Sequence, residues 1–147
     1  MTDWCEAFLY CASRVQHLEE IVAPALAEGK IVFCDRFVDS SYAYQGVARG
    51  LGLQRVMELN ALAVGEYMPQ YTLFLKLDPQ SAFKRKGGAD KNDRMELMNL
   101  DFHQKVYEGY CLLAEKYPER FITIDASGNK DETFGKIIAE LKQRKII

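Results

Sequence analysis

Three short apolar runs, each with an acidic residue at its carboxyl end, constrain the fold of this chain more than any other feature. They cover residues 31–34, 71–77 and 121–125, and the acidic residues are Asp35, Asp78 and Asp125. The segments between them carry apolar residues at the spacing of amphipathic helices. Strands that alternate with such helices are typical of α/β proteins with a mostly parallel sheet. Helices on both sides of the sheet predict that it is wider than three strands.

The composition predicts one soluble, globular domain. The chain has 147 residues, of which 48% are hydrophobic and 27% are charged. The net charge of −2 argues against a nucleic-acid partner, and no apolar stretch approaches the length of a membrane span. The four cysteines lack the spacing of metal ligands, which suits reduced thiols. We therefore expect a cytoplasmic protein with neither a nucleic-acid nor a membrane partner.

The stretch KIVFCDRFVDSSYAYQG, residues 30–46, concentrates side chains that can do chemistry. Its apolar run 31–34 predicts a strand buried on both faces, and Asp35 and Arg36 follow it directly. In an open α/β sheet, ligands bind just beyond the carboxyl ends of the strands. An acid and an arginine at that point can serve a metal ion and a phosphate together. The alternative is an ion pair at the end of the strand, with no ligand.

The segment RKGGADKNDR, residues 85–94, contains two glycines and almost no apolar side chain. Such a segment buries little surface, so we expect a mobile loop. Its basic residues either reach a ligand or only keep the loop solvated.

Several motifs together resemble the thymidylate kinase family. The resemblance rests on EAFLYCASRVQH at residues 6–17, CDRFVDSSYAYQG at 34–46, DRMELMNLDFH at 93–103 and PERFITIDAS at 118–127. It implies a three-layer fold like that of the P-loop kinases, with a parallel sheet. It also implies a homodimer that transfers a phosphoryl group from ATP to dTMP, with Mg2+ as the cofactor.

The resemblance assigns five residues to the nucleoside of dTMP. Tyr10 takes the place of a ring that stacks on thymine, and Arg14 would donate a hydrogen bond to thymine O4. Gln45 would read the edge of the base through its amide, with help from Ser41, and Tyr44 would pack under the sugar. Tyr10 and Arg14 are four residues apart and share one helix face. The alternative for this pair is a core tyrosine and a surface cation.

The phosphate of dTMP would be held by Arg36, because a forked donor suits a phosphate better than a lysine does. Asp35 would hold the Mg2+ ion and orient Arg36. Both roles are implied by the resemblance.

The phosphate donor would be bound by residues farther along the chain. The family carries its lid at about residues 85–96, which makes Arg85 and Arg94, with Lys86 and Lys91 nearby, the candidates for binding the ATP phosphates. The sequence leaves open which of these basic residues reaches them. A basic lid excludes water and offsets the charge that develops during transfer. Ala126 and Ser127 would border the adenine, through their backbone more than their side chains.

The resemblance stops short on the amino-terminal side. No G-x-x-x-x-G-K-[ST] motif occurs in the chain, and Met1 aligns with interior sequence of the family. This implies an amino-terminal truncation that removes the first β-α-β segment, so that residues 1–147 form the carboxyl-terminal part of a single domain. Loss of the family's first strand exposes the edges of strands 31–34 and 71–77. We expect these strands to pair directly, or one edge to be captured by a second copy of the chain.

The sequence leaves several functions open. The chain belongs to an active dTMP kinase, to another deoxynucleotide kinase of the same fold, or to an inactive remnant that binds dTMP or mediates dimerisation. In the last case, the helices predicted at residues 4–22 and 53–65 would form the dimer surface.

Overall fold

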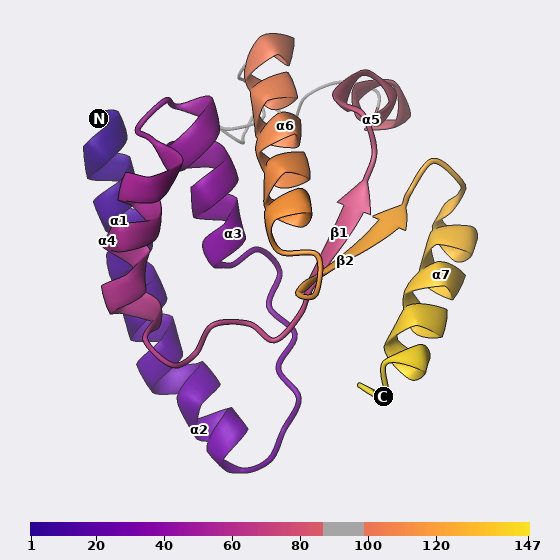
Figure 1. Cartoon of the computed structure of the whole chain (residues 1–147), viewed down its shortest axis with the longest axis horizontal. Coiled ribbons are helices and arrows are strands. Elements are labelled where there is room, and N and C mark those ends of the chain that lie inside the picture. Colours follow the sequence, from indigo (N-terminus) through magenta and orange to yellow (C-terminus); the bar gives the residue numbers. More distant parts are fainter. Residues whose placement is uncertain (87–98) are drawn as a thin grey trace. The chain divides into compact units, whose positions relative to one another are not determined.

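The computed structural model describes residues 1–86 and 99–147 and divides the chain into two compact units, residues 1–68 and 69–147 (Figure 1). Each unit has a core of its own. Val38, Ala43 and Val56 have no exposed surface in the first unit, and Leu113 has none in the second.

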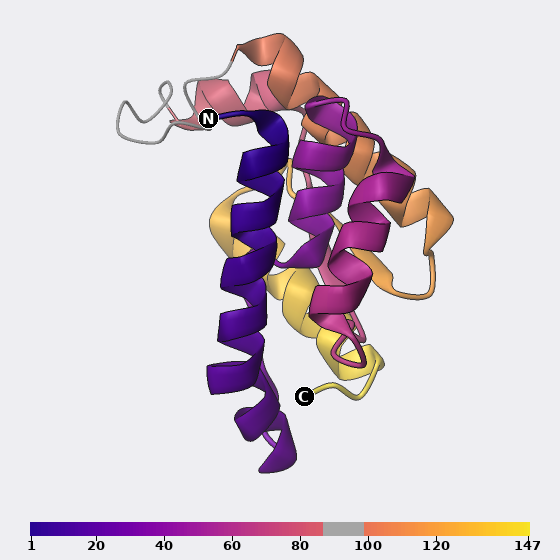
Figure 2. The ribbon, with the colours of Figure 1, turned by 90° about the vertical axis from the view of Figure 1, so that its left-hand side faces the viewer.

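The first unit begins with three successive helical segments: α1 (Asp3–His17), the π-helix η1 (Leu18–Val22) and α2 (Ala23–Ala27). Figure 2 shows them as one continuous rod. Thr2 caps the rod by accepting a hydrogen bond from the amide of Cys5 at 3.4 Å. Pro24 has no amide hydrogen to donate, and it lies at the start of α2, directly after the π-helix η1. Gly29, with φ of +75°, follows the end of α2 in the left-handed region.

The prediction of a buried strand at residues 31–34 is wrong. These residues are in no strand, and Ile31 and Phe33 are 58% and 64% exposed. The direct pairing that we expected between this segment and residues 71–77 is therefore also wrong. A parallel strand needs hydrogen-bonded neighbours, and no described segment supplies one for this run. Capture of an exposed edge by a second copy stays a prediction.

The second half of the first unit is also helical. It comprises α3 (Val38–Ser41), the π-helix η2 (Tyr42–Ala48) and α4 (Leu53–Val64). The last of these confirms the helix predicted at residues 53–65. Gly46 lies so close to α4 that a Cβ atom there would be 3.2 Å from the Cα of Leu53. This close approach lets α4 pack tightly on η2, and it needs glycine.

The second unit is built on a small parallel sheet. Strand β1 (Thr72–Lys76) pairs with β2 (Phe121–Asp125), in a register that runs from Thr72 opposite Phe121 to Lys76 opposite Asp125. Both strands confirm the predictions for 71–77 and 121–125. The sheet of the described residues has two strands, where the sequence predicted more than three.

Three helices accompany this sheet: α5 (Pro79–Lys86), α6 (Leu100–Lys116) and α7 (Lys130–Gln143). Figure 1 shows α6 and α7 on opposite sides of the sheet. Phe74 of β1 stacks on Tyr110 of α6, with ring centroids 5.4 Å apart. Successive residues of a strand point to opposite faces of the sheet. Ile122 and Ile124 of β2 therefore point away from the face that carries Phe74, and they are buried on the side of α7.

A capping box begins α7 and gives the first prediction. The side chain of Asn129 accepts from the amide of Glu132 at 2.9 Å, and the Glu132 carboxylate accepts from the amide of Asn129 at 3.2 Å. The cap is therefore Asn129, and Asp131 lies inside the first turn of the helix. Replacing Asn129 by alanine is expected to lower the free energy of unfolding by about 1 kcal/mol. Urea unfolding followed by far-UV circular dichroism measures this loss. The control variant Asp131→Ala should lose less, and an equal loss in both variants would contradict the assignment of the cap.

Candidate functional site

Arg14 is the centre of a buried polar cluster in the first unit. It lies on α1 and is 9% exposed. Its Nη1 donates to Oδ1 of Asn60, and its Nη2 donates to Oγ of Ser41 at 2.9 Å and to the carbonyl of Phe37 at 3.5 Å. The guanidinium carbon also lies 5.4 Å from the centre of the Phe37 ring. Arg14 is therefore buried and not a surface cation, and Ser41 lies beside it.

Asn60 of α4 orients this guanidinium, and the sequence analysis missed it. Its side chain is 1% exposed, and its Nδ2 donates to the carbonyl of Val56 at 2.8 Å. With the amide nitrogen so engaged, the oxygen faces Arg14. The available signal was a polar side chain within the apolar pattern of the predicted helix 53–65.

Burial lowers the pKa of Arg14, and the nearby Cys11 and Tyr42 partly oppose this effect. An arginine stays a cation at neutral pH despite such a shift. The cluster is thus a fixed positive charge held by neutral acceptors, which is suited to binding an electronegative atom of a ligand.

Gln45 belongs to a second buried network. It is 2% exposed, and its Nε2 donates to Oε1 of Glu6 at 3.0 Å. Arg49 donates to the same carboxylate from Nε at 3.4 Å and from Nη2 at 3.3 Å. Arg49 also lies 3.4 Å from the carboxylate of Asp3. Glu6, which sequence analysis did not select for the site, therefore connects Gln45 on η2 to α1.

Arg36 lies in the loop before α3 and has an unusual backbone. Its φ is +63°, in the left-handed region that residues other than glycine seldom adopt. Its guanidinium carbon lies 5.4 Å from the centre of the Tyr44 ring, and its side chain is exposed. Strained backbone of this kind is concentrated at functional sites. Asp35, beside it, is also exposed, and so is Tyr10 at 46%.

The fit of the loop to Mg2+ depends on its donor atoms. Within residues 1–86 and 99–147, no three His, Cys, Asp or Glu side chains are grouped so that they could hold a metal ion. Mg2+ is usually held by one or two carboxylates together with substrate phosphates and water. The exposed carboxylate of Asp35 fits that arrangement.

In the second unit, Arg85 holds the loop that follows β2. Its Nη1 donates to the carbonyl of Ala126 at 2.9 Å, and its Nη2 donates to the carbonyl of Ser127 at 2.8 Å. Asp125 accepts from Lys136 Nζ and from the amide of Ser127, and these two hydrogen bonds lower the pKa of its carboxyl group. The structure therefore brings together Arg85, Ala126 and Ser127, which the sequence analysis selected for the phosphate donor.

A hollow of about 350 Å³ lies at the carboxyl ends of β1 and β2, where ligands bind in α/β sheets. Ser127 lines it, together with Lys76, Leu77, Asp78, Tyr107, Thr123 and Asp125. Arg94 and most of the predicted lid, residues 85–96, lie outside the described residues.

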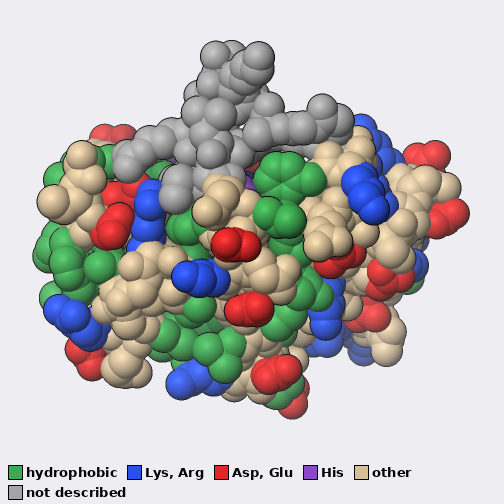
Figure 3. Space-filling model, turned by 90° about the horizontal axis from the view of Figure 1, so that it is seen from above, with side chains coloured by type: hydrophobic (Ala, Val, Ile, Leu, Met, Phe, Trp, Pro, Cys, Tyr) green, Lys and Arg blue, Asp and Glu red, His purple; other side chains and the backbone are tan. Residues whose placement is uncertain are grey.

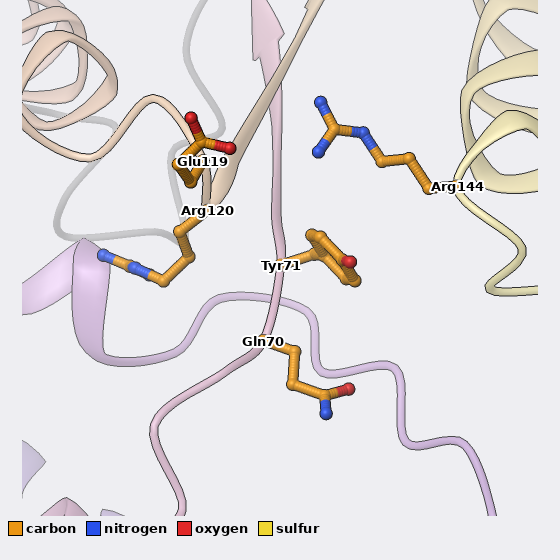
Figure 4. Close-up of a pocket in the computed structure, with 5 residues that line it drawn as sticks. All are labelled: Gln70, Tyr71, Glu119, Arg120 and Arg144. Carbon is orange, nitrogen blue, oxygen red and sulfur yellow. The ribbon is translucent and has the colours of Figure 1, made fainter.

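A second hollow, of about 490 Å³, lies at the opposite ends of the two strands (Figure 4). The lining residues are Gln70, Tyr71, Glu119, Arg120 and Arg144, none of which the sequence analysis selected. Arg120 donates to Thr72 at 2.9 Å, and Arg144 lies over the Tyr71 ring at 5.6 Å. The positive charges of Arg120 and Arg144 are balanced by two carboxylates: Glu119, which lines the hollow, and Glu140, which pairs with Arg144. The hollow therefore has no net charge that would favour an anionic or a cationic ligand.

The described surface is mixed in charge. On the face seen in Figure 3, acidic and basic side chains are interspersed. No helix in the described part of the chain has both the length and the apolar character needed to cross a membrane.

Comparison with known proteins identifies relatives along most of the chain. A family model described as Thymidylate kinase matches residues 1–137. A curated thymidylate kinase of Clostridium novyi is 50% identical over 139 residues, and one of Bacillus velezensis is 51% identical over 128 residues. These matches cover 93% and 86% of this chain. The chain spans 68% and 60% of the length of the two relatives, and 66% of a third from Lactobacillus helveticus that is 48% identical.

Proposed function

Because the chain belongs to the thymidylate kinase family, we propose that it serves the transfer of a phosphoryl group from ATP to dTMP, giving dTDP and ADP. The observation that carries this proposal is the buried cluster of Arg14, Ser41 and Asn60, together with the buried network of Gln45 and Glu6 in the same unit. The cluster fixes the cation of Arg14 and the network fixes the amide of Gln45, both in the first unit. The exposed ring of Tyr10 lies on the same helix as Arg14.

We assign the thymine base to these residues. A guanidinium has five N–H groups, and the contacts of Arg14 within the described residues use three, which leaves two to donate to thymine O4. Tyr10 lies four residues earlier on α1 and supplies a ring for stacking. Tyr44 would pack under the sugar.

We assign the phosphate of dTMP to Arg36. Its guanidinium lies over the Tyr44 ring, and the fork of N–H groups matches two phosphate oxygens. Asp35 would hold Mg2+ together with the phosphates, and the ion would offset charge on the transferred group. Arg36 binds and orients the acceptor phosphate, and phosphoryl transfer needs little from the protein beyond such positioning and the stabilisation of developing charge.

We assign ATP to the second unit. Ala126 and Ser127 would border the adenine, since their carbonyls are held by Arg85 at the end of α5. Arg85 positions the loop through these two hydrogen bonds, and Arg94 would bind the ATP phosphates. A cytoplasmic location belongs to the proposal and is supported by the four free cysteines.

Calorimetric titration of the chain with dTMP tests the base site directly. We expect saturable binding and a higher melting temperature with dTMP, and no such binding with dAMP, whose larger base presents different groups. Absence of dTMP binding would reject the proposal. A kinase assay then compares the chain with a fusion that carries the amino-terminal segment of the Clostridium novyi relative, and dTDP formation by the fusion is expected.

A dimerising role is the second candidate, because several large apolar side chains of the first unit are exposed. Leu62 of α4 is 93% exposed, and Phe8 and Leu9 of α1 are each 57% exposed. A homodimer built on this surface would be weakened by Leu62→Lys, as measured by sedimentation velocity. A chain that is monomeric at high concentration would reject the dimer.

A further inference from the structure

We propose that Glu6 determines the base preference of the site by fixing which end of the Gln45 amide faces the nucleotide. This inference rests on the proposed function and names a residue that need not touch the substrate. It begins from the hydrogen bond of 3.0 Å between Gln45 Nε2 and Glu6 Oε1, both on side chains of residues less than 4% exposed.

The orientation of the amide follows from the chemistry of its partner. An ionised carboxylate only accepts hydrogen bonds, whereas an amide has a donating nitrogen and an accepting oxygen. The Gln45 nitrogen must therefore face Glu6, because its oxygen would repel the carboxylate. Within the described residues, no other group bonds to the Gln45 side chain, so the amide oxygen is left to accept from a ligand.

Arg49 holds Glu6 in place. Its Nε and Nη2 lie 3.4 Å and 3.3 Å from the Glu6 oxygens, and the two side chains are only 13% and 4% exposed. A buried carboxylate with a buried cationic partner stays in one position, because leaving either charge unpaired is costly. The direction of the Gln45 amide is thus set by a network on the side away from the ligand.

An accepting oxygen at Gln45 selects among pyrimidines. Thymine and uracil carry an N3–H donor, which pairs with that oxygen. Cytosine has an unprotonated N3 at neutral pH, so two acceptors would face each other, and its amino group would face the donors of Arg14 instead of a carbonyl oxygen. A site built to make such hydrogen bonds rejects a ligand that cannot make them. Glu6 is therefore a positioning residue for an imide base.

Glu6→Gln tests this, because the new side chain keeps the size but can both donate and accept. The Gln45 amide is then able to turn over and donate to N3 of cytosine. In calorimetric titrations of the chain, we expect the preference for dTMP over dCMP to fall at least about tenfold, the worth of one hydrogen bond. The preference for dTMP over dUMP should stay unchanged, since both bases present the same imide edge. Glu19→Gln, at an exposed position, is the matched control and should change neither ratio.

A merely structural role for Glu6 would weaken all three nucleotides equally and leave both ratios unchanged, which would overturn this inference alone. A wild-type chain that binds no dTMP would overturn the proposed function as well. If Glu6→Gln does not fold, the inference is tested on the wild-type chain instead. There, the side-chain amide protons of Gln45 should exchange with solvent far more slowly than those of the exposed Gln54, as seen by nuclear magnetic resonance. Equal exchange rates would also overturn the inference.

Discussion

Replacing Arg14 by methionine is expected to lower the free energy of unfolding of the first unit by about 2–4 kcal/mol. The change orphans three acceptors: Oδ1 of Asn60, Oγ of Ser41 and the carbonyl of Phe37. Asn60 and Ser41 are 1% and 4% exposed, so water replaces the lost donors poorly. Methionine removes the cost of burying a charge, which keeps the net loss below the sum of three unsatisfied groups.

Trp4, the single tryptophan, lies in α1 and reports unfolding of this unit by its fluorescence in urea. Lys30→Met is the matched control, because it removes an exposed cation and only an exposed ion pair with Glu28. We expect the control to lower the free energy of unfolding by less than about 0.5 kcal/mol.

The same variant also tests ligand binding. We expect Arg14→Met to lose about 1.5–3 kcal/mol of dTMP binding free energy, as for a hydrogen bond from a charged donor. Wild-type stability and affinity in Arg14→Met would show that the cluster has no structural or binding role.

Replacing Arg36 by alanine is expected to cost at least about 3 kcal/mol of transition-state stabilisation, a loss of more than about 100-fold in kcat/KM. The reason is that Arg36 would hold the acceptor phosphate in line with the phosphoryl group. Its side chain is exposed and contacts the Tyr44 ring, so alanine should leave the fold intact. Steady-state kinetics of the fusion enzyme, with dTMP varied, measure the loss.

Two further substitutions of Arg36 show whether lost activity comes from the missing guanidinium or from a change in backbone conformation. Arg36→Lys keeps the charge but not the fork of donors, and we expect it to recover only part of the activity. Arg36→Gly suits the φ of +63° and loses the guanidinium, so it should be as inactive as alanine. Turnover near the wild-type rate in Arg36→Ala would reject the phosphate role. Activity in Arg36→Gly but not in Arg36→Ala would show that backbone conformation, and not the side chain, is what matters.

Local patterns predicted most of the helices and two of the strands. Residues 53–65, 71–77 and 121–125 carry the periodicity of their element within a few residues, and each forms it. Residues 31–34 carry an equally good strand pattern and form none. The difference is that a helix satisfies its backbone within its own segment, whereas a strand depends on a neighbour that its own residues do not encode.

The candidate site divides in the same way. The motifs alone selected Arg14, Ser41 and Gln45, because their spacing along the chain resembles that of a known family. They did not reveal Asn60, 46 residues from Arg14, or Glu6, 39 residues from Gln45.

The sequence by itself determined the family, the types of side chain at the site and most of the helices, since all of these are readable from residues close together in the chain. Only the tertiary structure decided that Arg14 is buried, which way the Gln45 amide turns and that the apolar run 31–34 forms no strand. Orientation and burial depend on contacts between segments far apart in the sequence, and those contacts exist only once the chain has folded.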